Sequence, residues 1–333
     1  MPTVLITPEA LIEKDGLHAA MLREAGFEIL FPRDREFTRG HADDAATIEE
    51  VKVADALIAG GEYLRAPALQ ELNQLRVIAR VGVGYDRIDV DAATRHGIAV
   101  TITPTANHQA VSEHALALLF ALSKRVVEDD RRTRSGEWPR DLIEPIRGKT
   151  MGLLGLGRIG RSMAPRCLAL GMHVMATDPY SDAEYAAQHG IRLVDFDELI
   201  AESDVLSIHC PCNEATVGLI NEQVLRSMKK SAYLINTARG PIVNETALAA
   251  ALKRGDIRGA GIDVLEHEPP AKDNPLFELE NVVITPHTAG LDRIAHRDMA
   301  IEAADCIVKL YRGEWPSEAV VNGTLAANWS WPA

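Results

Sequence analysis

A glycine-rich hexapeptide follows the short apolar run 151–154 and opens a helix-like segment over 158–170. The order strand, G-x-G-x-x-G, helix is the signature of a dinucleotide-binding unit. Glycine permits a tight turn and close approach of a pyrophosphate, and the helix N-terminus offers free N–H groups at the positive end of its dipole. The hexapeptide alone is a weak signal, so its setting carries the prediction. It reads Gly155-Leu156-Gly157-Arg158-Ile159-Gly160, in which Arg158 would add a charge to the phosphate site.

Short apolar runs alternate with helix-like stretches along the chain, which predicts an α/β fold with parallel sheets. The 333 residues leave room for two domains, because single cores seldom exceed about 250–300 residues. In the second half, six runs match a full Rossmann sheet. The runs lie at 4–6, 27–31, 56–59, 77–81 and 98–101, then at 151–154, 173–176, 205–208, 232–236, 259–263 and 282–285. We therefore expect two doubly wound parallel-sheet domains.

Two segments separate these halves. The stretch 107–124 is apolar on nearly every helical face, which predicts a helix buried in a core or packed between domains or subunits. The stretch 128–147 is charged and contains Gly136-Glu137-Trp138-Pro139. We interpret it as an excursion before the next strand.

Composition excludes several classes of protein. The net charge of −13 argues against a general nucleic-acid surface, which carries a basic stripe. The N-terminus lacks the features of a signal peptide and no run approaches the roughly 18 apolar residues of a membrane span, so we expect a cytoplasmic protein without membrane contact. Four scattered cysteines predict no disulfide framework. Cys210-Pro211-Cys212 suggests either a metal or redox pair or two reduced thiols, and we expect the thiols and no metal site.

Asp178 ends the apolar run that follows the glycine motif, 23 residues after Gly155. A carboxylate there accepts hydrogen bonds from the adenosine ribose hydroxyls and repels a 2′-phosphate. The prediction is NAD over NADP. The alternative is that Asp178 caps a turn before Pro179.

Three further side chains follow strand-like runs or lie in the adjoining loops, where open α/β sheets bind their ligands. Arg239 presents a planar, permanently charged fork suited to a carboxylate or carbonyl oxygen. His287 is able to give and take a proton near neutrality. Glu268 beside it would fix the ring and stabilise the imidazolium. Taken singly, each residue also has a structural explanation, as a surface ion pair, a structural histidine or a loop glutamate.

The chain closely resembles the D-isomer-specific 2-hydroxyacid dehydrogenases, the family of phosphoglycerate, glycerate and hydroxypyruvate enzymes. The resemblance covers nearly the whole length and rests on several motifs in the same order. They are Val81 to Asp89, Gly152 to Gly160, His209-Cys210-Pro211 with Thr216, Asn236 to Gly240, Asp263 with Glu268-Pro269, and Thr285 to Gly290.

This resemblance implies roles for individual residues. Arg239 would bind the carbonyl and carboxylate of the substrate, His287 would be the acid/base and Glu268 its partner. The backbone N–H groups of Val83 and Gly84 would hold the substrate carboxylate. Asp263 would meet the nicotinamide carboxamide. The remaining residues of the cofactor path would be Pro211, Thr216, Thr237, Ala238 and Gly290.

The resemblance also implies a domain arrangement. A discontinuous, flavodoxin-like substrate domain would comprise 1–103 and 291–333, with an NAD-binding Rossmann domain at 104–290 inserted into it. Substrate would lie in the cleft, and closure would exclude water. Family members are usually dimers joined through the cofactor domain, so Trp138 either reaches a neighbouring subunit or packs locally.

The reaction expected is hydride transfer between NAD(H) and a small D-2-hydroxy acid and its 2-oxo acid, such as hydroxypyruvate, glyoxylate or 3-phosphoglycerate. Arg65, Arg80 and Arg293 would suit a phosphate or second carboxylate unless they are ordinary ion-paired or solvated residues, and Glu62 would oppose such an anion. The alternative is an NAD(H)-sensing binding protein on the same scaffold, like the corepressors of this family. Intact Arg239, Glu268 and His287 do not exclude it.

Overall fold

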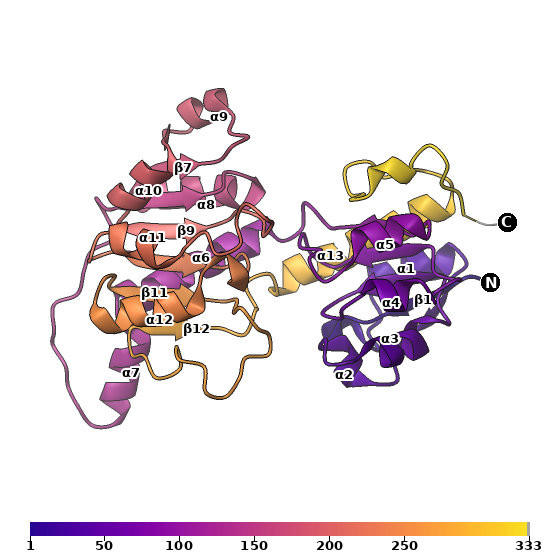
Figure 1. The fold of residues 1–333 in the computed structure, drawn as a ribbon, viewed down its shortest axis with the longest axis horizontal. Helices are drawn as coiled ribbons and strands as arrows, with labels where there is room; N and C mark the ends of the chain where they lie inside the picture. Colours follow the sequence, from indigo (N-terminus) through magenta and orange to yellow (C-terminus); the bar gives the residue numbers. More distant parts are fainter. Residues whose placement is uncertain (332–333) are drawn as a thin grey trace. The chain divides into compact units, whose positions relative to one another are not determined.

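A computed structural model describes residues 1–331, apart from the side chains of residues 35 and 36. The chain divides into two compact units (Figure 1). The first unit comprises Met1–Asn107 and the chain from Arg293 onward, and the second unit is His108–Asp292. Residues 332 and 333 of the expected 291–333 segment lie outside the described residues.

The first unit is built on a five-stranded parallel sheet of order β2-β1-β3-β4-β5, which is the flavodoxin-like order. Its strands are β1 (Thr3–Ile6), β2 (Glu28–Leu30), β3 (Ala56–Ala59), β4 (Val77–Arg80) and β5 (Ala99–Thr101). Its helices are η1 (Glu9–Leu11), α1 (Leu17–Glu24), α2 (Arg35–Thr38), α3 (Asp44–Val51), α4 (Ala66–Leu69), α5 (Val90–Arg95), α13 (Arg293–Tyr311) and η3 (Gly323–Leu325). Two apolar cores, one containing α1 and α13 and the other α3 to α5, cover the two faces of this sheet.

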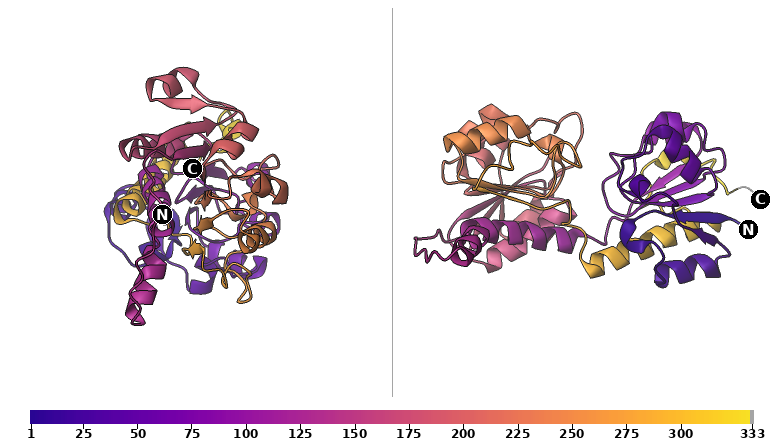
Figure 2. Two further views of the ribbon diagram at one scale, coloured as in Figure 1. Left: turned by 90° about the vertical axis from the view of Figure 1, so that its left-hand side faces the viewer. Right: turned by 90° about the horizontal axis from the view of Figure 1, so that it is seen from below.

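The second unit has a seven-stranded parallel sheet of order β12-β11-β10-β9-β6-β7-β8, the Rossmann order with one strand added. Its strands are β6 (Thr150–Leu154), β7 (His173–Thr177), β8 (Ile191–Leu193), β9 (Val205–Ile208), β10 (Tyr233–Asn236), β11 (Gly259–Ile262) and β12 (Val282–Ile284). Its helices are α6 (His108–Ser123), α7 (Val126–Arg134), α8 (Arg158–Ala169), α9 (Ala183–Gln188), α10 (Phe196–Glu202), α11 (Glu222–Ser227), η2 (Gly240–Ile242) and α12 (Glu245–Arg254). Helices α6 and α8 pack on one face of this sheet and α10 to α12 on the other (Figure 2).

The predicted fold class is therefore confirmed: both sheets are parallel, with a flavodoxin-like and a Rossmann strand order. The expectation of six strands in the second sheet is wrong by one. Strand β8 was missed because it is a three-residue edge strand with the exposed Arg192 at its centre, so it lacks a continuous apolar run.

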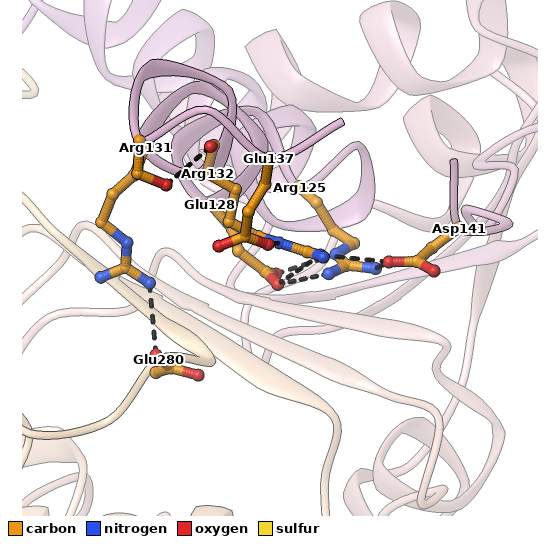
Figure 3. Close-up of polar contacts among 8 residues, drawn as sticks. Arg125, Glu128, Arg131, Arg132, Glu137, Asp141 and Glu280 are labelled. Carbon is orange, nitrogen blue, oxygen red and sulfur yellow. Dashed lines mark hydrogen bonds and ion pairs between the residues drawn. The ribbon is translucent and has the colours of Figure 1, made fainter. Parts of the chain in front are cut away.

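The stretch 128–147, interpreted from the sequence as an excursion before the next strand, is helical in its first part, because α7 occupies Val126–Arg134. This helix has no buried residue, so the apolar periodicity that marks a packed helix is missing. Charged contacts replace it. Arg125 pairs with Glu128 and Asp141, and Arg132 pairs with Glu137 and Asp141 at 2.8 and 3.1 Å (Figure 3). These ion pairs connect α7 to the irregular segment that follows it.

The long helix α6 is buried as predicted along most of its length. Ala115, Leu118 and Leu119 lie in the core that it shares with α8. Ala117 is exposed, so one side of the helix is not covered by the described residues. None of the helices within residues 1–331 combines the length and apolar character needed to cross a bilayer.

Candidate active site

The strand register of the second sheet aligns the ends of its strands. Leu154 pairs with Thr177 and Ile208, and the alignment continues through Asn236, Ile262 and Ile284. Because all strands are parallel, the residues that follow them gather at one edge of the sheet. They are Gly155, Asp178, His209, Thr237, Asp263 and Thr285. Six of the segments singled out in the sequence therefore converge on this carboxyl edge.

The glycine loop between β6 and α8 has the geometry that a phosphate cradle requires. Gly155 has φ +105°, and a Cβ there would lie 2.7 Å from the backbone carbon of His209. A Cβ at Gly160 would overlap the carbonyl oxygen of Gly155. Gly157, the N-cap of α8, has open space where its Cβ would be. Two glycines are thus required by packing, and the third leaves the helix N-terminus accessible to an anion.

The carboxylate of Asp178 binds two backbone N–H groups. Its Oδ2 accepts from Leu156 in the glycine loop and its Oδ1 from Tyr180, both at 2.8 Å. Asp178 thus caps its own turn, as the alternative interpretation expected. It also supports the glycine loop. Each carboxylate oxygen is able to accept a further bond. Its contact with a ribose remains a prediction.

The loop after β10 is held by its own hydrogen bonds. The side chain of Asn236 donates to the carbonyl of Arg239 at 2.9 Å and accepts from the N–H of Ala238 at 3.0 Å. Nη1 of Arg239 donates to the carbonyl of Ala238 at 2.6 Å. A Cβ at Gly240 would overlap the backbone of Leu265, so the loop after β10 and the one after β11 touch directly. This contact keeps Arg239 beside the loop that carries Glu268.

Glu268 and His287 form a hydrogen-bonded pair. Nδ1 of His287 lies 2.7 Å from Oε2 of Glu268, and the other carboxylate oxygen accepts from the N–H of Leu265 at 3.1 Å. The side chains are 41% and 21% exposed. Within the described residues nothing bonds Nε2 of His287. The imidazole is therefore oriented by a carboxylate through one nitrogen and open to proton exchange through the other.

Asp263 holds the turn that carries His287. Its carboxylate is fully buried and accepts from the N–H groups of Thr288 and Ala289 at 2.9 Å each and from the hydroxyl of Thr285 at 2.5 Å. Its carbonyl accepts from the N–H of His287 at 2.8 Å. His287 has φ +55°, a conformation that is unfavourable for any residue except glycine and so needs this support. Oδ2 retains room for one more donor.

The loop after β9 supplies further predicted cofactor residues. The hydroxyl of Thr216 donates to the carbonyl of Pro211 at 2.7 Å and accepts from the N–H of Asn213 at 2.8 Å, which closes this loop on itself. Burial raises the pKa of the Cys210 thiol to about 11, so the thiol stays protonated at neutrality. The cysteines are all reduced, and in the described part of the chain no group of three metal-ligating side chains gathers.

Two buried polar atoms at this edge have no partner within residues 1–331: Oγ1 of Thr237 and Nδ1 of His209. Nε2 of His209 lies 2.9 Å from the hydroxyl of Ser207, and burial lowers the pKa of this imidazole to about 4. No role of the His209 side chain was predicted from the sequence, although its position directly after a buried strand was a usable signal. Unpaired buried polar atoms between a glycine cradle and a capped carboxylate fit a polar ligand such as a dinucleotide.

In the first unit, Val83 and Gly84 follow β4. Gly82 has φ +130° and exchanges hydrogen bonds with Thr103, which fixes the turn. Among the described residues no group accepts a bond from the N–H of Val83 or Gly84. Two adjacent unpaired N–H groups at a strand end suit a carboxylate.

Two charged residues of the first unit, Arg65 and Glu62, already have partners. Arg65 pairs with Asp44 at 3.3 Å. Glu62 is buried, which raises its pKa, and it accepts from the hydroxyl of Thr7 and the N–H of Gly60. Arg293 is exposed at the start of α13.

Comparison with known proteins places this chain in a family. Residues 116–289 match the model of the D-isomer specific 2-hydroxyacid dehydrogenase, NAD-binding domain. The D-3-phosphoglycerate dehydrogenase of Archaeoglobus fulgidus is 42% identical over 80% of this chain and 51% of its own length. The glyoxylate reductase of Korarchaeum cryptofilum is 40% identical over 82% of this chain and 84% of its own. The chain spans about half the length of the phosphoglycerate dehydrogenases that it matches.

Among solved structures, the D-lactate dehydrogenase of Aquifex aeolicus complexed with NAD and lactic acid has a TM-score of 0.83 and is 28% identical to this chain. The similarity covers 96% of this chain and 98% of that one. Together with the matched NAD-binding domain, it supports an NAD(P) cofactor. The chain belongs to the D-isomer specific 2-hydroxyacid dehydrogenase family.

Proposed function

We propose that this protein is an NAD-dependent oxidoreductase that interconverts a small D-2-hydroxy acid and its 2-oxo acid. The observation that carries the proposal is the His287–Glu268 pair, with 2.7 Å between Nδ1 and Oε2, at the carboxyl edge of a Rossmann sheet. Proton transfer to a carbonyl oxygen needs an acid/base that is oriented and accessible, and this pair provides both.

The catalytic residues of the proposal are Arg239, Glu268 and His287. Bound NADH would supply the hydride. Arg239 binds the carboxylate and the carbonyl oxygen of the 2-oxo acid, and its fixed charge stabilises the oxyanion that develops. His287 donates a proton from Nε2 to that oxygen, and Glu268 stabilises the imidazolium before the transfer. The N–H groups of Val83 and Gly84 bind the substrate carboxylate, which would make the first unit the substrate-binding domain.

The cofactor residues of the proposal lie in the second unit. The glycine loop, with Arg158 and Ile159, would hold the pyrophosphate, and Asp178 would bind the ribose hydroxyls and so select NAD over NADP. Asp263 would receive the carboxamide on Oδ2. The remaining contacts would come from Pro211, Thr216, Thr237, Ala238 and Gly290.

The identity of the substrate beyond its carboxylate group is proposed from two observations. Two proteins similar to this chain are named glyoxylate reductase and D-3-phosphoglycerate dehydrogenase. The pairing of Arg65 with Asp44 and the buried carboxyl of Glu62 favour glyoxylate or hydroxypyruvate over a phosphorylated acid. We propose a cytoplasmic homodimer joined through the second unit, without a nucleic-acid or membrane partner. No described feature favours the alternative of an NAD(H) sensor.

The test is the oxidation of NADH with a panel of 2-oxo acids, for the wild type and for His287→Ala. We expect turnover of at least one short 2-oxo acid, and a loss of about 100-fold or more in the variant with unchanged NADH affinity. His173→Ala is the matched control, because His173 is exposed at the opposite end of a strand in the same sheet. Tight NADH binding without turnover on any acid would favour the sensor. Unchanged turnover in His287→Ala would remove the acid/base assignment.

A further inference from the structure

We propose that His114 is a positioning residue that acts through Thr285 and Asp263 to hold the turn carrying His287. The structural part of this inference concerns only the shape of that turn. Its catalytic consequence rests on the proposed function of His287. His114 lies in α6, a helix outside every motif to which the sequence analysis gave a chemical role.

The side chain of His114 reaches the end of β12 from the face of the sheet covered by α6. Its Nε2 lies 2.9 Å from Oγ1 of Thr285 and 3.5 Å from Oδ1 of Asp263. The side chain is 23% exposed, so it is partly shielded from water in this position. Three elements that are distant in sequence thus meet at the buried carboxylate.

The chemistry of the three groups fixes the direction of the bonds. The hydroxyl of Thr285 has one proton and donates it to Oδ1 of Asp263 at 2.5 Å. Oγ1 of Thr285 is then left as an acceptor toward His114, so Nε2 of His114 carries the proton. The result is a directed chain from His114 through Thr285 to Asp263.

Asp263 transmits this arrangement to the catalytic turn. The carboxylate that receives the chain also accepts the N–H groups of Thr288 and Ala289, and the backbone carbonyl of Asp263 accepts the N–H of His287. His287 is held at φ +55°. If the carboxylate rotated, both amides that follow His287 would lose their acceptor. His114 opposes this rotation through its contacts with Thr285 and with Oδ1 of Asp263.

The first test measures the turn without using activity. Hydrogen exchange of the Thr288 and Ala289 amides is compared in the wild type, His114→Leu and Thr285→Val. We expect exchange about tenfold faster in both variants, because each removes one member of the chain. His114→Gln and Thr285→Ser retain a donor and a hydroxyl, and we expect them to restore most of the protection. Glu113→Gln is the control on the same helix, since Glu113 is 64% exposed.

The second test measures reduction of the best 2-oxo acid. A displaced catalytic group lowers kcat, so we expect kcat to fall about 10-fold to 100-fold in His114→Leu, while the KM for the acid changes by less than about twofold. The affinity for NADH should fall by a smaller factor than kcat, because Asp263 is also the proposed ligand of the carboxamide. The double variant with Thr285→Val should lose little more than either single variant, because both act through one carboxylate. Glu113→Gln should keep the wild-type kcat.

Three outcomes would overturn the proposal: unchanged exchange of the two amides in the Leu and Val variants, additive losses in the double variant, or a fall in NADH affinity that matches the fall in kcat. If His114→Leu fails to fold, Thr285→Val alone decides through the same readouts. If the wild type turns over no 2-oxo acid, the proposed function fails, but the exchange experiment still decides whether His114 holds the turn.

Discussion

Nδ1 of His287 lies 2.7 Å from Oε2 of Glu268, although the two residues come from loops after different strands, β12 and β11. The pairing is possible because these strands are neighbours and their ends are in register. Glu268 is in turn oriented by the N–H of Leu265. The dyad is therefore positioned by backbone on both sides, and the substitutions below separate its charge from its geometry.

Glu268→Gln should retain the shape of the dyad and remove its charge. We expect kcat for reduction of a 2-oxo acid to fall about 10-fold to 100-fold, because the neutral amide no longer balances the positive charge of the ring that donates the proton. The measurement is kcat and KM for the 2-oxo acid at neutral pH. Glu266→Gln in the same loop is a control for loop damage, and a wild-type kcat in Glu268→Gln would contradict the assigned role.

Arg239→Lys should retain the charge and lose the planar fork. We expect the KM for the 2-oxo acid to rise and kcat/KM to fall about 10-fold to 100-fold, because an ammonium group cannot bind carboxylate and carbonyl in the same bidentate manner. The affinity for NADH, measured by fluorescence titration, should not change. A loss of NADH affinity equal to the loss of kcat/KM would instead place Arg239 in the cofactor site.

The sequence predicted both sheets and the site segments because buried strands and glycine turns leave local signals. Strand β8 and helix α7 left none, since one is an edge strand centred on Arg192 and the other is held by exposed ion pairs. The fold of the central helix α6 was predicted, but the contact of His114 with Thr285 depends on how that helix packs on the sheet. No local pattern encodes such a contact.

Asp178 shows a second limit of sequence reasoning. Its place after β7 predicted a ribose ligand, and the alternative of a turn cap was left open. The structure shows that the carboxylate caps the turn and binds the glycine loop. Residue type and spacing identified Asp178 as a residue at the end of β7. Which of its carboxylate oxygens already accept hydrogen bonds depends on the folded structure.

Substitution of two glycines of the cradle by alanine should affect stability and NADH affinity differently. Gly160→Ala places a Cβ onto the carbonyl of Gly155, so we expect a loss of about 1–3 kcal/mol in the free energy of unfolding. Gly157→Ala meets open space, so the fold should be retained while the affinity for NADH falls about tenfold, because the methyl group occupies the approach to the helix N-terminus. Urea unfolding and NADH titration on both variants check this. Equal effects of the two substitutions on unfolding would contradict it.

Buried His209 should make the protein sensitive to acid. Its folded-state pKa is about 4, below the ordinary value of 6.5, because burial disfavours the charged ring. The unfolded chain therefore gains a proton that the folded chain excludes as the pH falls below 6.5, and stability decreases until about pH 4. The difference in urea midpoint between neutral pH and about pH 5 should be smaller in His209→Gln than in wild type. Burial also lowers the pKa values of His18 and His296, so these histidines contribute in the same direction. An exposed control, His173→Gln, should behave as wild type.

The proposed dimer depends on the segment from α7 to β6, which exposes apolar side chains. Trp138 is 78% exposed and Leu142 fully so, and these are the apolar side chains that the proposed dimer would cover. The ion pairs of Arg125 and Arg132 with Asp141 fix this segment, so its apolar side chains are exposed without any rearrangement of the segment (Figure 3).

We expect Trp138→Ser with Leu142→Ser to shift the mass measured by light scattering from dimer to monomer, because the apolar contact is lost. Val217→Ser with Phe277→Ser removes two exposed apolar side chains elsewhere in the second unit and should leave the mass unchanged. A wild-type protein that is monomeric at all concentrations, or a mutant that remains dimeric, would contradict this assignment.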